Sequence, residues 1–173
     1  FIHFMEEDGS YNYGARVGAK DDGSGNILFG IGASSSTLTY GTTSFDLDTT
    51  YLLVASYDIA TGTANLYVLS SAQATEPSNP EATNTGNSGY SIERIGVRQG
   101  SGGPNALIDG IRVANTWSAI MSNDELDDEV IGDKVALEMG YTFVEGAWVT
   151  PSDRFYLVSV VDFDSMGEES GQP

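Results

Sequence analysis

A stretch near the middle of the chain, residues 105–120, combines the pattern of a core strand with a polar turn that carries Trp117. Both faces of an extended chain over residues 105–114 are largely apolar, apart from Asp109 and Arg112. A strand with two apolar faces is typical of a position inside a packed β-structure. The stretch therefore predicts a buried strand of a β-sandwich, and Trp117 marks where that strand ends.

Other segments repeat the strand pattern along most of the chain. Apolar residues occupy alternate positions over 11–19, and residues 51–57 and 64–69 form two strand patterns joined by the turn 58–63. The composition agrees, with 21 glycines, 10% aromatic residues and only 18% charged residues. We therefore expect an all-β fold, an antiparallel two-sheet jelly-roll sandwich, over residues 1–121.

The pattern changes from Ser122 onward. Ser122 and Glu125 have the spacing of a capping box, which predicts one short helix near 122–131. Two further strands are predicted over 141–150 and 154–163, so residues 122–166 either extend or complete the sandwich. Residues 167–173 are expected to form a loose acidic tail.

Charge excludes two classes of partner. The chain has 25 acidic and 7 basic residues and a formal net charge of -18, which repels nucleic-acid phosphates and anionic lipids. No apolar run approaches the roughly 20 residues of a membrane-spanning helix.

The absence of cysteine excludes disulfides and cysteine-ligated zinc. Since the chain opens on Phe1 without a signal peptide, we expect a processed chain or a piece of a longer one.

Four collinear segments carry a resemblance to a known family. They lie at residues 57–68, 75–80, 95–100 and 108–117. Over residues 11–120 the chain resembles the laminin-G-like, concanavalin-A-like jelly-roll modules of secreted multidomain proteins of the Bacteroidota type. The resemblance implies two packed antiparallel sheets, export, and a role in adhesion, glycan binding or support of other domains. It assigns no catalytic residue.

Two groups of residues are candidates for ligand binding. Tyr90 in a long loop and Trp117 in a turn could stack against sugar rings, although most large aromatics of a sandwich belong to its core. Asp21, Asp22 and Asn26 could offer oxygen ligands to calcium. A hairpin turn is the favoured explanation of these three residues, because Asp, Gly and Asn are the residues that such turns require.

An acidic segment raises the alternative of catalysis. Glu125, Asp127 and Glu129 alternate as the carboxylates of jelly-roll β-glycanases do, but Asp128 stands where a core residue is required. The chain's one histidine, His3, lies in an apolar strand and is no base for a serine triad. We therefore predict a non-catalytic, secreted module for cell-surface adhesion or glycan binding. The expected partner of this module is a glycan or another surface protein. The alternatives are a structural subunit of an extracellular filament or assembly, which pairs with its neighbours through strand edges, and a jelly-roll β-glycanase.

Overall fold

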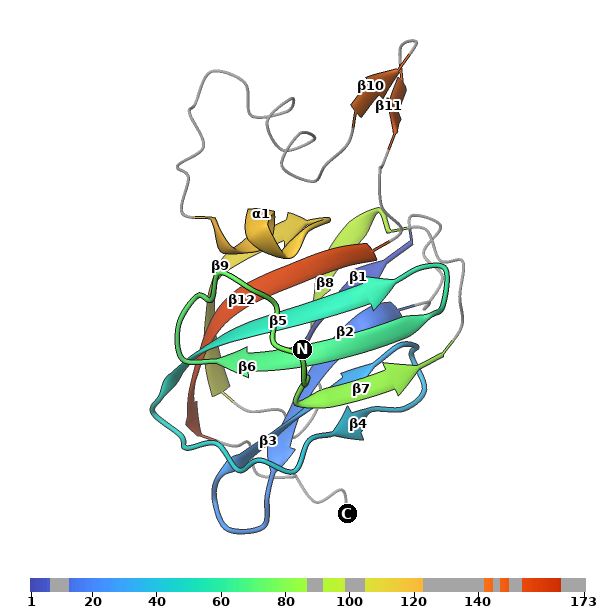
Figure 1. Cartoon of the computed structure of the whole chain (residues 1–173). Helices are drawn as coiled ribbons and strands as arrows, with labels where there is room; N and C mark the ends of the chain where they lie inside the picture. Colours follow the sequence, from blue (N-terminus) through green and yellow to red (C-terminus); the bar gives the residue numbers. More distant parts are fainter. Residues whose placement is uncertain are drawn as a thin grey trace.

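The computed structural model describes residues 1–6, 13–86, 92–98, 105–122, 142–144, 147–149 and 154–165, and nearly all of its elements are strands (Figure 1). In chain order these elements are β1 (Ile2–Met5), β2 (Tyr13–Asp21), β3 (Ile27–Gly32), β4 (Thr39–Tyr40), β5 (Thr50–Asp58), β6 (Thr63–Leu69), β7 (Ala82–Thr85), β8 (Arg94–Val97), β9 (Asn105–Ala114), α1 (Trp117–Met121), β10 (Thr142–Val144), β11 (Ala147–Val149) and β12 (Arg154–Ser165).

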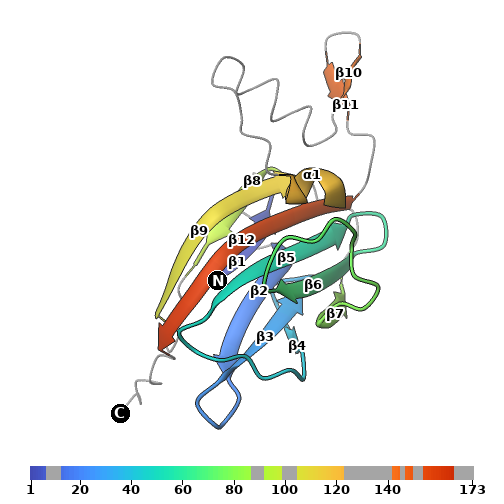
Figure 2. The ribbon, with the colours of Figure 1, turned by 60° about the vertical axis from the view of Figure 1, so that its left-hand side comes forward.

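Two five-stranded sheets form a sandwich. The first sheet has the order β4-β3-β2-β1-β8 and the second has the order β7-β6-β5-β12-β9, with antiparallel pairing throughout (Figures 1 and 2). The predicted all-β fold with two antiparallel sheets is confirmed. Residues 142–149 hold two short strands, β10 and β11, that pair with each other, where the sequence predicted one strand.

The core lies between the two sheets and follows from the period of two along each strand. Side chains that alternate on the inner face of each sheet interdigitate and are removed from water, which is the main favourable term in folding. The largest of these fully buried side chains come from both sheets: Phe4, Phe29, Ile31, Leu53, Tyr57, Leu66, Leu157 and Phe163.

The middle strands of the second sheet are buried on both faces. A second apolar cluster covers the outer face of this sheet, where Val54, Tyr156 and Val158 pack beneath Trp117 and Ile120 of α1. Double burial explains why β5 and β12 have nearly continuous apolar sequences. Because β12 lies between β5 and β9, the segment Arg154–Ser165 is an integral part of the sandwich.

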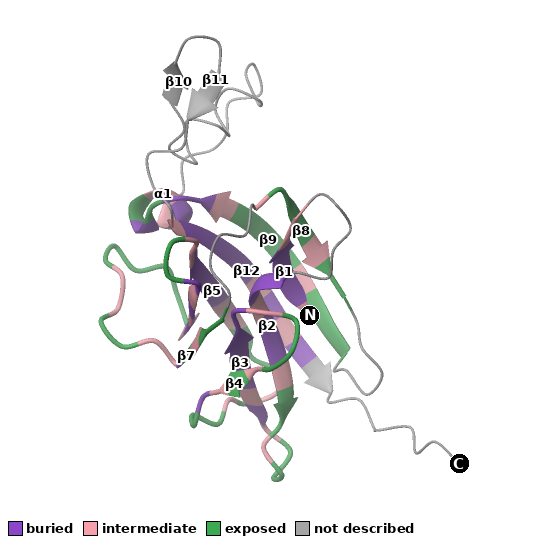
Figure 3. Ribbon diagram, turned by 90° about the vertical axis from the view of Figure 1, so that its right-hand side faces the viewer, coloured by how far each residue is buried: buried purple, intermediate pink, exposed green. Residues whose placement is uncertain are grey.

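The position of β9 corrects the expectation of a buried strand over residues 105–114. We expected a strand buried on both faces, but β9 is the edge strand of the second sheet, and most of its residues are exposed (Figure 3). Leu107 is 77% exposed and Ile111 is 42% exposed. The buried strand with two apolar faces is its neighbour β12. An apolar sequence shows that a strand can be buried, but it does not determine whether the strand lies at the centre or at the edge of its sheet.

One short helix is described, and it lies directly before the segment where a helix is predicted. Helix α1 spans Trp117–Met121, and its N-cap is Thr116, whose hydroxyl accepts from the Ala119 amide at 3.2 Å. Residues 123–141, which include most of the predicted helix near 122–131, lie outside the described residues, and so does the predicted tail. No helix in the described part of the chain has the length and apolarity needed to cross a membrane.

Glycines shape the outer face of the first sheet. A Cβ atom on Gly30 would lie 2.8 Å from the Tyr40 ring, and one on Gly18 would lie 2.5 Å from Leu38. At Gly18 the end of the Leu38 side chain would have to move, whereas at Gly30 the Thr39 carbonyl oxygen would also lie at 3.0 Å, so a larger residue there requires the backbone to shift. The segment that carries Leu38 and Tyr40 therefore lies directly against the sheet.

Candidate functional site

A pocket opens on the outer face of the second sheet, beside the start of α1. Its volume is about 740 Å³. Three parts of the chain that are far apart in sequence form its walls: the loop 74–76, residues 115–118 at the start of α1, and the neighbouring ends of β5 and β12. The loop crosses the sheet there, so the fold brings polar side chains from all three parts together.

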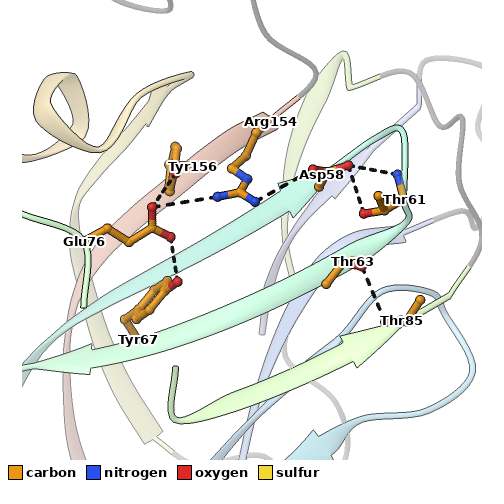
Figure 4. A network of polar contacts seen from close by, with 8 residues as sticks. All are labelled: Asp58, Thr61, Thr63, Tyr67, Glu76, Thr85, Arg154 and Tyr156. Carbon is orange, nitrogen blue, oxygen red and sulfur yellow. Dashed lines mark hydrogen bonds and ion pairs between the residues drawn. The ribbon is translucent and has the colours of Figure 1, made fainter. Parts of the chain in front are cut away.

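Glu76 is the centre of a polar network at this pocket (Figure 4). Tyr67 donates to its Oε1 at 2.6 Å, Tyr156 donates to its Oε2 at 2.8 Å, and an Arg154 nitrogen lies 3.8 Å from Oε2. Burial, together with the carboxylate of Glu76, raises the pKa of Tyr67 and of Tyr156. Both tyrosines therefore remain protonated donors, and both oxygens of Glu76 are engaged.

Asp58 extends the network to the end of β5. Its Oδ1 accepts from the Thr61 amide at 2.8 Å and from the Thr61 hydroxyl at 2.9 Å. The Thr61 amide is the main reason that the pKa of Asp58 lies below its usual value, and Arg154, 3.8 Å from Oδ2, adds to the effect. Arg154 thus lies between the carboxylates of Asp58 and Glu76. The Tyr156 hydroxyl is the main cause that raises the pKa of Arg154, and the two carboxylates raise it further.

Trp117 lines the pocket but is itself almost fully covered. The indole is 7% exposed and donates its Nε1 hydrogen to the Gln73 carbonyl at 2.8 Å. The rings of Tyr67 and Tyr156 approach it edge-on at centroid distances of 5.3 and 6.0 Å. Trp117 therefore anchors the loop and α1 to the sheet, and in this arrangement no open ring face is available for a stacked ligand.

Asn115 is the residue of the pocket wall whose bonding is incomplete. It is 4% exposed, and neither Nδ2 nor Oδ1 has a hydrogen-bond partner in the described part of the structure. A buried amide without partners costs about 1–3 kcal/mol. The wall of this pocket therefore holds one unused donor group and one unused acceptor.

The other predicted site residues lie elsewhere. Asp21, Asp22 and Asn26 form the turn between β2 and β3, where Asp22 accepts from the amides of Ser24 at 2.7 Å and Asn26 at 3.1 Å. The Ser44 hydroxyl also donates to Asp22 and is the main cause of its lowered pKa. Among the described residues, no three metal-ligating side chains come together. Tyr90 and the acidic segment with Glu125, Asp127 and Glu129 lie outside the described residues.

The sequence identified Trp117 as a candidate for ligand binding, and Trp117 lines this pocket. It gave no indication of Asn115, Asp58, Glu76 or Arg154, which line the same pocket. The available signal was the length of the loop after β6, because long loops in compact domains are frequently functional. Nothing in the local sequence indicates that Glu76 meets Tyr156, 80 residues away.

The fold and the pocket define the chain as an antiparallel β-sandwich with a polar pocket on the outer face of one sheet. No protein-family model, curated protein or solved structure matches it.

Proposed function

We propose that the chain is a non-catalytic module of a secreted or cell-surface protein and that it binds a glycan in the pocket beside α1. The observation that carries the proposal is the buried Asn115 amide without partners at the pocket wall. The resemblance to laminin-G-like modules, which implies adhesion or glycan binding, supports the same role.

The pocket suits a polar ligand of sugar size. Its volume of about 740 Å³ falls in the range of about 300–1,000 Å³ that is typical of small-molecule sites. A sugar hydroxyl both donates and accepts hydrogen bonds, so it can satisfy Oδ1 or Nδ2 of Asn115 after a small side-chain rotation. Arg154 and Asp58, which also line the pocket, offer further polar contacts.

The bonding of the carboxylates supports binding without catalysis. Retaining glycosidases need one free carboxylate nucleophile and one protonated carboxyl about 5 Å apart. Glu76 has both oxygens engaged by tyrosine hydroxyls, and the hydrogen bonds to Asp58 favour its ionised form. Neither group has the environment of a general acid.

The test replaces Asn115 with leucine, a side chain of similar size without polar atoms. If the amide binds a glycan, Asn115→Leu abolishes glycan-array and calorimetric binding, while the free energy of unfolding stays level or rises because an unpartnered amide is removed. The matched control is Asn65→Leu on β6. In the parent chain the Asn65 Oδ1 atom accepts a hydrogen bond from the Thr83 hydroxyl, so this amide is already partnered, and its removal should leave glycan binding unchanged. Glycan binding that survives Asn115→Leu, or a parent chain that binds no glycan, contradicts the proposal.

A second candidate function, assembly through strand edges, is favoured by β8 and β9, which end the two sheets in the described part of the chain. Ile95 and Val97 lie opposite the buried Phe4 and Ile2 in the first sheet, so they share its inner face. They are nevertheless 39% and 59% exposed, and Ile111 on β9 is 42% exposed. Apolar edge strands are the usual sites of strand addition. We therefore propose, as the alternative, a structural subunit whose copies pair at this side.

Light scattering at increasing protein concentration distinguishes the two functions. Measurements at high salt are required, because a net charge of -18 opposes contact between copies. Assembly through this side predicts a mass above that of the monomer. Val97→Lys should return the mass to that of the monomer, whereas Thr49→Lys, which introduces the same residue at another exposed position, should leave the mass unchanged. A parent chain that stays monomeric throughout contradicts assembly.

A further inference from the structure

A second pocket, distinct from the one beside α1, lies against the first sheet. Its volume is about 230 Å³, and His3, Arg16, Gly18, Leu38 and Arg98 are among its lining residues. Ile2 and Phe4 point into the core, so His3 between them points to the outer face of the sheet. The pocket is therefore part of the outer face of the first sheet.

The charge of this pocket is opposite to that of the chain. Arg16 and Arg98 both line it, although the whole chain has only 7 basic residues against 25 acidic ones. None of the lining residues within the described part of the chain is acidic. A cationic pocket in a strongly acidic chain attracts small anions and repels the chain's own carboxylates.

The bonding of Arg16 is incomplete. Its Nε is buried and has no hydrogen-bond partner among the described residues. Arg16 follows Ala15, whose φ is 45°, at the irregularity where the register between β1 and β2 shifts. Such irregularities commonly redirect a side chain next to a site. The fold therefore directs a guanidinium with an unpartnered Nε toward a pocket whose described lining carries no carboxylate.

The pKa of His3 reflects the positive potential of this pocket. Burial is the main cause that lowers its pKa to about 4, and nearby positive charges, including Arg16 and Arg98, lower it further. The imidazole is therefore neutral at pH 7 and can still donate one N–H. Because the imidazole is neutral, the positive charge on the described lining side chains belongs to Arg16 and Arg98.

We propose that this pocket binds a small oxyanion, a sulfate, phosphate or carboxylate group, between Arg16 and Arg98. Guanidinium groups present paired N–H donors that match the oxygens of such anions. The volume of about 230 Å³ is below the usual range of sites for drug-sized ligands, so the pocket suits a single anionic group. The site is independent of the glycan pocket, because its residues belong to the other sheet.

The test uses the whole chain with sodium sulfate, phosphate or acetate, titrated at constant ionic strength against chloride. The chain has one histidine, so the imidazole signals in the NMR spectrum report His3 alone. We expect saturable binding and an upward shift of the His3 pKa, because a bound anion favours the protonated imidazole. Arg98→Gln removes an exposed side chain and should weaken binding about tenfold or more.

The matched control is Lys20→Gln, which removes one positive charge from β2 outside the pocket lining and should leave binding unchanged. A sulfated monosaccharide distinguishes a free anion from one carried by a sugar. If the chain binds the sulfated monosaccharide more tightly than sulfate, and this binding depends on Arg98, the ligand is an anion carried by a sugar. If it binds the sulfated monosaccharide equally or more weakly, the ligand is the free ion. The proposal is overturned if none of the anions saturates, or if Lys20→Gln weakens binding as much as Arg98→Gln does.

Discussion

At the scale of single residues, the outer face of the second sheet depends on a few fully bonded polar groups. Glu76 accepts from two tyrosine hydroxyls and lies near Arg154, and Trp117 donates to the Gln73 carbonyl. These bonds hold the loop after β6 against the sheet, because each one joins a loop residue to a strand or helix. They therefore form the wall in which the unpartnered amide of Asn115 lies.

Glu76→Gln should destabilise the protein. Glutamine keeps one acceptor oxygen but loses the charge and places an amide hydrogen donor beside a tyrosine that also donates. We expect the free energy of unfolding to fall by about 1–3 kcal/mol, measured by urea denaturation. Glu93→Gln, the same change at an exposed position, should have little effect. An equal loss in both variants would show that the network contributes nothing specific.

The lowered pKa of His3 predicts that the stability of the fold depends on pH. The folded pKa of about 4 lies below the ordinary value of 6.5, so the unfolded chain binds the proton more tightly. Stability from the neutral imidazole is complete above about pH 6.5 and is lost progressively toward pH 4, by up to about 3 kcal/mol. The groups around the imidazole are Tyr13, Arg16, Arg98 and the Phe1 amine.

Titration of the single imidazole by NMR measures this pKa directly. His3→Phe should flatten the stability profile between pH 6.5 and pH 4, since no titrating group then remains at that position. A His3 pKa near 6.5 in the folded chain would contradict the burial that we describe.

At the scale of elements, glycines decide how segments pack on the first sheet. Tyr40 lies over Gly30, and Leu38 lies over Gly18. This arrangement also forms part of the small cationic pocket, because Gly18 and Leu38 both line it.

Gly30→Ala should displace the Tyr40 ring. The added Cβ would lie 2.8 Å from the ring and 3.0 Å from the Thr39 carbonyl oxygen, so β4 must shift. Overpacking of this kind costs about 1–3 kcal/mol, measured as a lowered denaturation midpoint. Gly23→Asn is the control, because a Cβ there meets nothing within 4 Å and asparagine tolerates a positive φ. A loss no greater than that of the control would contradict the close approach.

At the scale of the whole molecule, the sandwich depends on β12, the last of the described strands. β12 lies between β5 and β9, and it places Phe155, Leu157 and Phe163 in the core. The strands of the second sheet that precede it cannot close that sheet, because β5 and β9 do not pair with each other.

A chain that ends at Ser122 should therefore fail to fold. It lacks β12, so it exposes the inner core and the edge of β5 to solvent. We expect no cooperative thermal transition and a loss of dispersion in NMR spectra. A chain that ends at Ser165 keeps every strand of the two sheets and should unfold cooperatively. Cooperative unfolding of the shorter chain would show that residues 1–121 fold without β12.

The sequence by itself determined the class of fold, because the period of two and the turn residues act over a few neighbouring positions. The hairpin of β5 and β6 and the turn at Asp22 are local in this sense, and both agree with their patterns. The place of β9 at an edge, the insertion of β12 and the meeting of Glu76 with Tyr156 required the tertiary structure. These features depend on contacts between residues far apart in sequence, and the order of strands in a sheet is set by the packing of all strands together.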